Sequence, residues 1–219
     1  MIKKINLGVL ISGSGNTLQN FIDQIEIGNL NAAIQVVISS KPNVVGLDRA
    51  RKYHIPTAIV PYSNYKDIDS FSCAITNELD KYPIDLITLA GFIHLYKIPE
   101  KYSGMVMNIH PGLIPAFCGH KYYGKKVHDA AINYGVKVSG CTVHFADNNY
   151  DNGPIIIQRT VPVLNDDTPD ALAARVFKEE CEAYPEAIRL FAAGRLRIEG
   201  RKVKILNHNA DSPLSHNHS

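Results

Sequence analysis

In the first half of the chain, apolar residues follow a strand-like pattern and a helix-like pattern in turn. Residues 5–11 form a short apolar run that ends at a Ser-Gly turn, which is typical of a buried strand. Residues from about 65 to 82 instead carry apolar side chains at intervals of three and four, which predicts a helix with one buried face. The same reasoning predicts strands at residues 32–39, 57–60, 86–90 and 105–109, and helices at 16–27 and 44–53. This alternation implies right-handed βαβ units and a parallel sheet.

The pattern changes after residue 110. Residues 111–123 contain Gly, Pro and aromatic residues without periodicity, which predicts a loop over a ligand site. Further elements are predicted as a helix at 124–134, strands at 139–145 and 155–161, a long helix at about 170–192, and a hairpin of residues 196–198 and 203–205. Pro185 lies inside the long helix and is expected to kink or divide it, because proline lacks the N–H of a helical hydrogen bond.

These elements predict one α/β domain over residues 1–206, followed by a polar tail at 207–219. We expect a mostly parallel twisted sheet with helices on both faces and an antiparallel extension in its C-terminal part. The 219 residues include 45% hydrophobic and 20% charged residues, as in an ordinary globular protein. The formal charge of +2 argues against a nucleic-acid surface, which would need clustered Lys and Arg.

Cysteine usage and hydropathy indicate a cytoplasmic protein. The four cysteines are far apart and show no C-x-x-C spacing, so we expect reduced thiols and no metal site. No apolar run approaches the roughly 20 residues of a membrane span, so no membrane association is expected. Small molecules are the expected partners, and the chain is expected to be a monomer or a homodimer.

Three polar segments follow predicted strands, and ligands bind beyond the carboxyl ends of strands in such sheets. The first is a glycine-rich turn at residues 12–17, the second is residues 91–96, and the third starts at Asn108. Gly13 and Gly15 allow backbone angles closed to other residues and let N–H groups face an anion at a helix start. Taken alone, such a turn has roughly even odds of being only a tight connection.

Asn108, His110 and Asp151 supply an amide, an imidazole and a carboxylate. The amide can hold an oxyanion, the imidazole can move a proton near neutral pH, and the carboxylate can favour the charged imidazole. Taken singly, each has a structural explanation as a strand-end or turn residue. His128 and His144 rank below His110, because a helix-face histidine and a hydrogen-bonded sheet histidine explain them equally well. Together with the turn, the set indicates acyl transfer onto a phosphorylated amine.

Several motifs resemble those of one family. They are ISGSGN at residues 11–16, LAGF at 89–92, NIHP at 108–111, SGCTVHF at 139–145, DNGPII at 151–156, and ARV at 174–176 with Glu180 and Tyr184-Pro185. Over residues 5–206 the chain is similar to the phosphoribosylglycinamide formyltransferase family, folate-dependent enzymes of purine synthesis. NIHP with a later D-x-G-P is specific to folate formyltransferases, and the Ser-Gly-rich turn narrows the resemblance to the glycinamide ribonucleotide enzymes.

The resemblance implies a Rossmann-like formyltransferase fold without a metal, with a phosphate-binding half at about 1–104 and a catalytic and folate half at about 105–206. It implies transfer of the formyl group of 10-formyltetrahydrofolate, a co-substrate, to the amine of glycinamide ribonucleotide. Asn108 and protonated His110 would hold the oxyanion, and Asp151 would support the imidazolium. The implied phosphate and ribose residues are Gly13, Ser14, Gly15, Asn16, Thr17 and Glu180. The implied folate residues are Phe92, Ile93, His94, Leu95, Tyr96, Asn108, Asp147 and Asp151.

Three alternatives stay open at this point. A formyltetrahydrofolate hydrolase would use the same catalytic residues but needs no ribonucleotide phosphate site. Another amine formyltransferase, such as a tRNA-directed enzyme, shares NIHP, but we expect no room in this chain for a tRNA-binding domain. A catalytically silent nucleotide-binding domain would not need the Asn, His and Asp set.

Overall fold

The computed structural model describes residues 4–207, in which nine strands form one sheet in the order β3-β2-β1-β4-β5-β6-β7-β9-β8. The strands are β1 Ile5–Ile11, β2 Ala32–Ser39, β3 Thr57–Ile59, β4 Leu86–Leu89, β5 Val106–His110, β6 Val138–Phe145, β7 Ile155–Pro162, β8 Leu196–Glu199 and β9 Lys202–Ile205. Strands β1 to β5 pair in parallel, whereas β5–β6, β6–β7 and β8–β9 pair antiparallel. The predicted mostly parallel sheet with an antiparallel extension is therefore confirmed. The predicted polar tail falls almost wholly outside the described residues.

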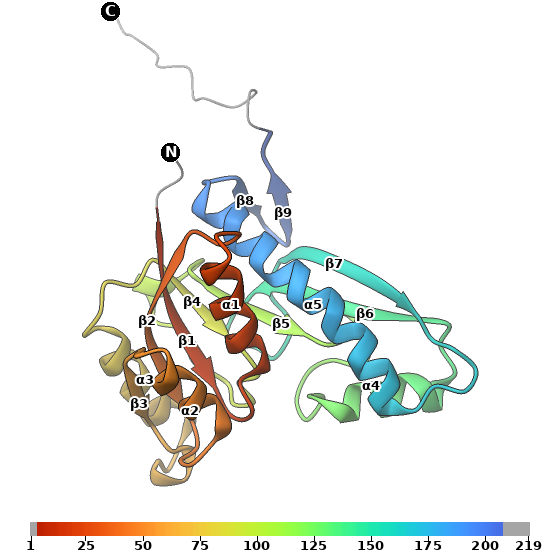
Figure 1. The fold of residues 1–219 in the computed structure, drawn as a ribbon, viewed down its shortest axis with the longest axis horizontal. Coiled ribbons are helices and arrows are strands. Elements are labelled where there is room, and N and C mark those ends of the chain that lie inside the picture. The colour runs from red at the N-terminus through yellow and green to blue at the C-terminus, as the bar shows by residue number, and fades with distance from the viewer. Residues whose placement is uncertain (1–3, 208–219) are drawn as a thin grey trace, which may run out of the picture.

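Helices cover both faces of this sheet (Figure 1). They are α1 Asn16–Glu26, α2 Val45–Lys52, α3 Ile68–Leu79, α4 Lys125–Tyr134 and α5 Pro169–Ala192, with short 3-10 turns at Tyr62–Asn64 and Glu100–Tyr102. The apolar side chains of α3 pack on one face, and those of α1, α2, α4 and α5 belong to the cluster on the other. Val9 and Leu10 in β1 join opposite clusters, because successive side chains of a strand point to opposite faces.

Local sequence explains where the helices begin. Asp67 Oδ1 accepts a hydrogen bond from Ser70 N over 2.8 Å and caps α3. Thr168 accepts from Ala171 N over 3.2 Å and caps α5, whose first residue is a proline. Helix α1 begins differently, after Gly15 in the left-handed conformation at φ 68° and without a side-chain cap. The first N–H groups of α1 are therefore left without a capping side chain at the end of β1.

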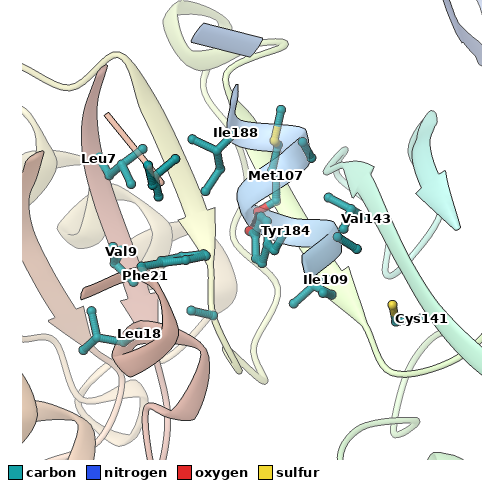
Figure 2. Packing of buried hydrophobic residues seen from close by; sticks show 14 of the residues in the cluster. Leu7, Val9, Leu18, Phe21, Met107, Ile109, Cys141, Val143, Tyr184 and Ile188 are labelled. Atoms are coloured by element: carbon teal, nitrogen blue, oxygen red, sulfur yellow. Dashed lines mark hydrogen bonds between the residues drawn. The ribbon is translucent and has the colours of Figure 1, made fainter. Parts of the chain in front are cut away.

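Tyr184 connects α5 to the strands that carry the candidate site. Figure 2 shows its side chain beside Met107, Ile109 and Val143 in the larger core cluster. Its buried hydroxyl donates to Met107 O over 2.7 Å and lies 3.3 Å from Leu89 O. Leu89 is the last residue of β4, and Met107 directly precedes Asn108 in β5, so this hydroxyl ties α5 to both strands beside the candidate site.

Pro185 was expected to kink or divide the long helix, and division is contradicted, since α5 runs from Pro169 to Ala192 as one helix. A proline at this position leaves the carbonyl four residues earlier, that of Cys181, without its helical donor. Asn20 on α1 supplies the missing donor, because its Nδ2 donates to Cys181 O over 2.9 Å. Helices α1 and α5 lie next to each other (Figure 1), so the Asn20 side chain can reach the carbonyl on α5.

Candidate active site

Asn108, His110 and Asp151 meet where β5 ends. Asn108 Nδ2 donates to Asp151 Oδ1 over 3.1 Å, and His110 Nδ1 lies 3.4 Å from Asp151 Oδ2. Asp151 comes from the loop between β6 and β7 and has a positive φ of 49°. Gly119 N donates to Asp151 Oδ2 over 2.9 Å, so the loop at 111–123 lies over the carboxylate as predicted. Asp151 lies about forty positions after Asn108 and His110 in the sequence, and the fold brings all three together.

The ring of His110 is 2% exposed and has an oxygen beside each nitrogen. Nε2 lies 3.0 Å from Phe117 O, and Nδ1 faces Asp151. Burial lowers the pKa of His110 below its usual value, although the charge of Asp151 and the Phe117 carbonyl oppose this shift. The ring therefore has partners for a proton on either nitrogen but releases that proton more readily than a solvated histidine.

Burial alone would raise the pKa of Asp151, but interactions with His144, His110 and Gly119 N–H outweigh it. The net pKa of Asp151 lies below its usual value, so the carboxylate is ionised at neutral pH. A charged carboxylate beside an imidazole that titrates readily is the arrangement needed to gain and release a proton during a reaction.

Asn108, His110 and Asp151, the candidate catalytic cluster, open on a cavity of about 540 Å³. All five residues of the predicted folate segment line it, together with Asp147. Two hydrogen bonds tie this segment to the loop that carries Asp151: Leu95 N donates to Tyr150 Oη over 3.1 Å, and Ile98 N donates to Asn148 Oδ1 over 2.8 Å. The two segments therefore form one wall.

The residues of the predicted folate segment differ in the polar groups that they can offer to a ligand. His94 stacks on Tyr62 with ring centroids 4.2 Å apart, and its buried Nε2 has no protein partner among the described residues. Burial lowers the pKa of His94, with a smaller contribution from Lys41. Tyr96 is 2% exposed and pairs its hydroxyl with Thr76 over 2.9 Å, so it has less polar surface to offer a ligand.

A smaller cavity of about 250 Å³ lies against the glycine-rich turn. It is lined by Gly13, Ser14, Gly15, Asn16, Thr17, Ala90, Gly91, Phe177 and Glu180, which include every predicted phosphate and ribose residue. The expectation of a special backbone angle holds at Gly15 only, because Gly13 has no positive φ and open space where a Cβ would stand. Burial raises the pKa of the half-buried Glu180 to about 7.

The sequence of this chain is similar to those of known proteins. The sequence profile described as formyl transferase matches residues 5–188. The chain belongs to the formyl transferase family. It is 37% identical over 200 residues to phosphoribosylglycinamide formyltransferase of Haemophilus influenzae, covering 90% of this chain and 91% of that protein. It is 40% identical to the human trifunctional purine biosynthetic protein adenosine-3 over 93% of this chain, but it spans only 20% of that protein.

Solved formyl transferase structures share the fold. Glycinamide ribonucleotide transformylase 1 from Symbiobacterium toebii matches with a TM-score of 0.86 and 43% identity, covering 93% of this chain and 95% of that one. A formyltetrahydrofolate deformylase from Pseudomonas syringae matches with a TM-score of 0.82 at 22% identity, covering 94% of this chain and 67% of that one. The fold is therefore common to transferring and hydrolysing relatives, and the site has to distinguish between them.

Two histidines that the sequence analysis ranked low, His128 and His144, line the larger cavity. His144 is 1% exposed and lies opposite Asn108 in the β5–β6 pairing. His128 on α4 is 3% exposed, and its Nδ1 has no partner among the described residues. The antiparallel register of β5 and β6 is the signal that could have found His144, because a strand partner of Asn108 must point to the same side.

Within residues 4–207, no helix is long and apolar enough to cross a membrane. In the same range, no group of three His, Cys, Asp or Glu side chains is arranged to hold a metal ion. All four cysteines are free, as predicted.

Proposed function

We propose that this chain transfers the formyl group of 10-formyltetrahydrofolate to the amine of glycinamide ribonucleotide, in purine biosynthesis. The observation that carries the proposal is the continuity of the two cavities. Their linings share Asn16, Thr17, Gly91, Phe177 and Glu180. A ligand with its phosphate on the 13–17 turn can thus extend past Glu180 toward the catalytic cluster, where the larger cavity has room for a folate.

The chemistry assigned to the site is an acyl transfer. The substrate amine attacks the formyl carbon, a new C–N bond forms, and negative charge gathers on the formyl oxygen. Protonated His110 stabilises that charge, and Asp151 stabilises the imidazolium. The C–N10 bond then breaks, and the proton lost by the attacking amine is passed to N10 of the folate through His110. The short distances from Asp151 to His110 and Asn108 support these roles.

The phosphate end of the ligand would bind at the start of α1. The uncapped N–H groups that follow Gly15 and the positive end of the helix dipole favour an anion there. Ser12 links this turn to the folate segment, because Ile93 N donates to Ser12 Oγ over 3.1 Å. The two ligands are therefore held by segments that are hydrogen-bonded to each other. The names of the bacterial relatives, which align over nearly their full lengths, support the same substrate.

The deciding experiment follows release of tetrahydrofolate from 10-formyltetrahydrofolate with and without glycinamide ribonucleotide. We expect release only when the ribonucleotide is present. Equal release without it would make the chain a hydrolase, and formylation of charged initiator tRNA at a comparable rate would make it a tRNA-directed enzyme. No release under any condition would leave a catalytically silent domain.

Two histidine variants control this assay. His110→Asn should abolish the ribonucleotide-dependent release. His54→Asn should leave release unchanged, because His54 is exposed, does not line either cavity, and has a positive φ of 56° that asparagine tolerates. Loss of activity in both variants would indicate unfolding and not catalysis.

A further inference from the structure

His144 contacts the catalytic cluster from the neighbouring strand. Its Nδ1 lies 2.8 Å from Phe145 O, and its Nε2 lies 3.1 Å from Asn108 Nδ2. A carbonyl oxygen only accepts hydrogen bonds, so His144 Nδ1 must carry a hydrogen and donate it. In the neutral ring the lone pair lies on Nε2, where it accepts from the Asn108 amide at 3.1 Å, while Asp151 Oδ1 is farther from Nε2, at 3.8 Å and beyond hydrogen-bond distance.

Asp151 fixes the orientation of the same amide from a second direction. An ionised carboxylate only accepts, so the group that faces Asp151 Oδ1 at 3.1 Å must be Asn108 Nδ2 and not Oδ1. Asn108 Nδ2 has two hydrogens, and one goes to His144 while the other goes to Asp151. Oδ1 is the remaining polar atom of a half-buried side chain that lines the cavity.

This arrangement bears on the expected oxyanion role of Asn108. To donate to an oxyanion, Asn108 would have to give up its bond to His144 or to Asp151. The Oδ1 of Asn108, which belongs to a side chain that lines the cavity, can instead accept an N–H of the attacking amine. That hydrogen bond would turn the nitrogen lone pair toward the formyl carbon, which is a contribution of orientation and not of charge.

We propose that His144 is a positioning residue, which holds the Asn108 amide so that its carbonyl oxygen receives an N–H of the attacking amine. This inference rests on the proposed formyl transfer. It gives His144 no part in moving protons. Its contribution depends on the acceptor atom at Nε2, and a side chain that offers an acceptor at the same place should replace it.

The test compares two substitutions of His144 whose side chains differ in length. Glutamine places an amide oxygen near the position of Nε2, so His144→Gln should keep kcat within about fivefold. Asparagine reaches only the position of Nδ1, so His144→Asn should keep the hydrogen bond to Phe145 O but lose the acceptor at the Nε2 position. We expect kcat to fall roughly thirtyfold or more, within the range for misplaced catalytic groups. The KM values for both substrates should change less than about threefold in either variant.

A double-mutant cycle checks that His144 acts through Asn108. In an Asn108→Ala background, His144→Asn should cause little further loss, because the group it positions is already absent. Additive losses would overturn the proposal. Equal loss in His144→Gln and His144→Asn, with one limb of the pH–rate profile removed in both, would also overturn it by making His144 a proton-transfer group.

A measurement on the wild-type protein does not depend on any variant folding. The nitrogen chemical shifts of the His144 ring report which nitrogen carries hydrogen, and we expect hydrogen on Nδ1 and none on Nε2 at neutral pH. Hydrogen on Nε2 would refute the proposal outright. If the wild-type protein shows no formyl transfer but has the expected ring tautomer, then the proposed function fails while the geometry of His144 stands.

Discussion

Gly15 should be the most sensitive position of the phosphate turn, and an alanine there should separate ribonucleotide binding from folate binding. A Cβ added at Gly15 would stand 2.7 Å from Gly46 Cα in α2. Carbon atoms in contact normally lie about 3.5–4.0 Å apart, so the turn and α2 must separate by roughly 1 Å. The clash is with backbone, and no side chain can rotate away to relieve it.

The backbone angle adds to this steric cost. Gly15 has a φ of 68°, and the left-handed conformation costs an L-residue about 1–2 kcal/mol. Separation of the turn from α2 also weakens the bond from Gly46 N to Gly13 O, now 3.1 Å long. A lost hydrogen bond of this kind contributes about 1 kcal/mol. We therefore expect Gly15→Ala to lower the free energy of unfolding by about 2–3 kcal/mol, or Tm by about 5–10 °C.

Gly13→Ala is the matched control, two residues away in the same turn. No atom lies within 4 Å of a Cβ at Gly13, so its stability should change by less than about 0.5 kcal/mol. Calorimetric titration should show ribonucleotide affinity at least roughly tenfold weaker in Gly15→Ala, with folate affinity unchanged. Because Gly13 itself lines the smaller cavity, Gly13→Ala is a control for stability only. Normal ribonucleotide binding by Gly15→Ala, or equal loss of both ligands, would refute the assignment of this turn to the phosphate.

Three further predictions concern single side chains. Asp151→Asn should lower kcat by about a hundredfold or more with little change in KM, because an amide cannot stabilise the imidazolium by charge. Near-normal turnover in steady-state assays would show that Asp151 has no part in the mechanism. Glu180→Gln should stabilise the protein increasingly as pH rises from about 4.5 to about 7, by about 3 kcal/mol above that range, because ionising the Glu180 carboxyl destabilises the fold. Melting curves at pH 4 and pH 8 test this, and an equal gain at both would contradict it. Arg49→Met should weaken ribonucleotide binding in titrations, because Arg49 Nε donates to Ser14 O over 2.9 Å and braces the turn. Arg51→Met, which breaks only an exposed pair with Asp48, should bind the ribonucleotide like wild type.

Hydropathy patterns predicted the positions of the strands well, because buried parallel strands are uniformly apolar and differ clearly from the polar residues on either side of them. The strand at residues 5–11 was predicted at its observed bounds. Helix ends were less accurate, and α3 spans residues 68–79 where 65–82 was expected. The residues before Asp67 form a 3-10 turn and a connection, and the Asp67 cap is a local signal that could have corrected the start of α3.

Contacts between segments that lie far apart in the chain could not be predicted from the sequence. His144 was identified only as a sheet residue, because its meeting with Asn108 depends on the register of two antiparallel strands. The behaviour of Pro185 depends on a donor 161 residues from the carbonyl it serves. Local propensity favours a break at such a proline, and a tertiary hydrogen bond supplies the donor that the proline lacks. Roles in catalysis and ligand binding stay predictions until the assays described above are done.

The bond from Asn20 to Cys181 O makes two positions of the chain interdependent in evolution. While proline occupies position 185, replacing Asn20 by a residue without a donor leaves a helical carbonyl with no partner, at a cost of about 1–3 kcal/mol. If Pro185 first became alanine, the helix would regain its own N–H, and Asn20 would be free to vary. The order of the two substitutions therefore decides whether the lineage passes through a destabilised intermediate. Across relatives, we expect loss of the asparagine to be found mainly where the proline is also absent.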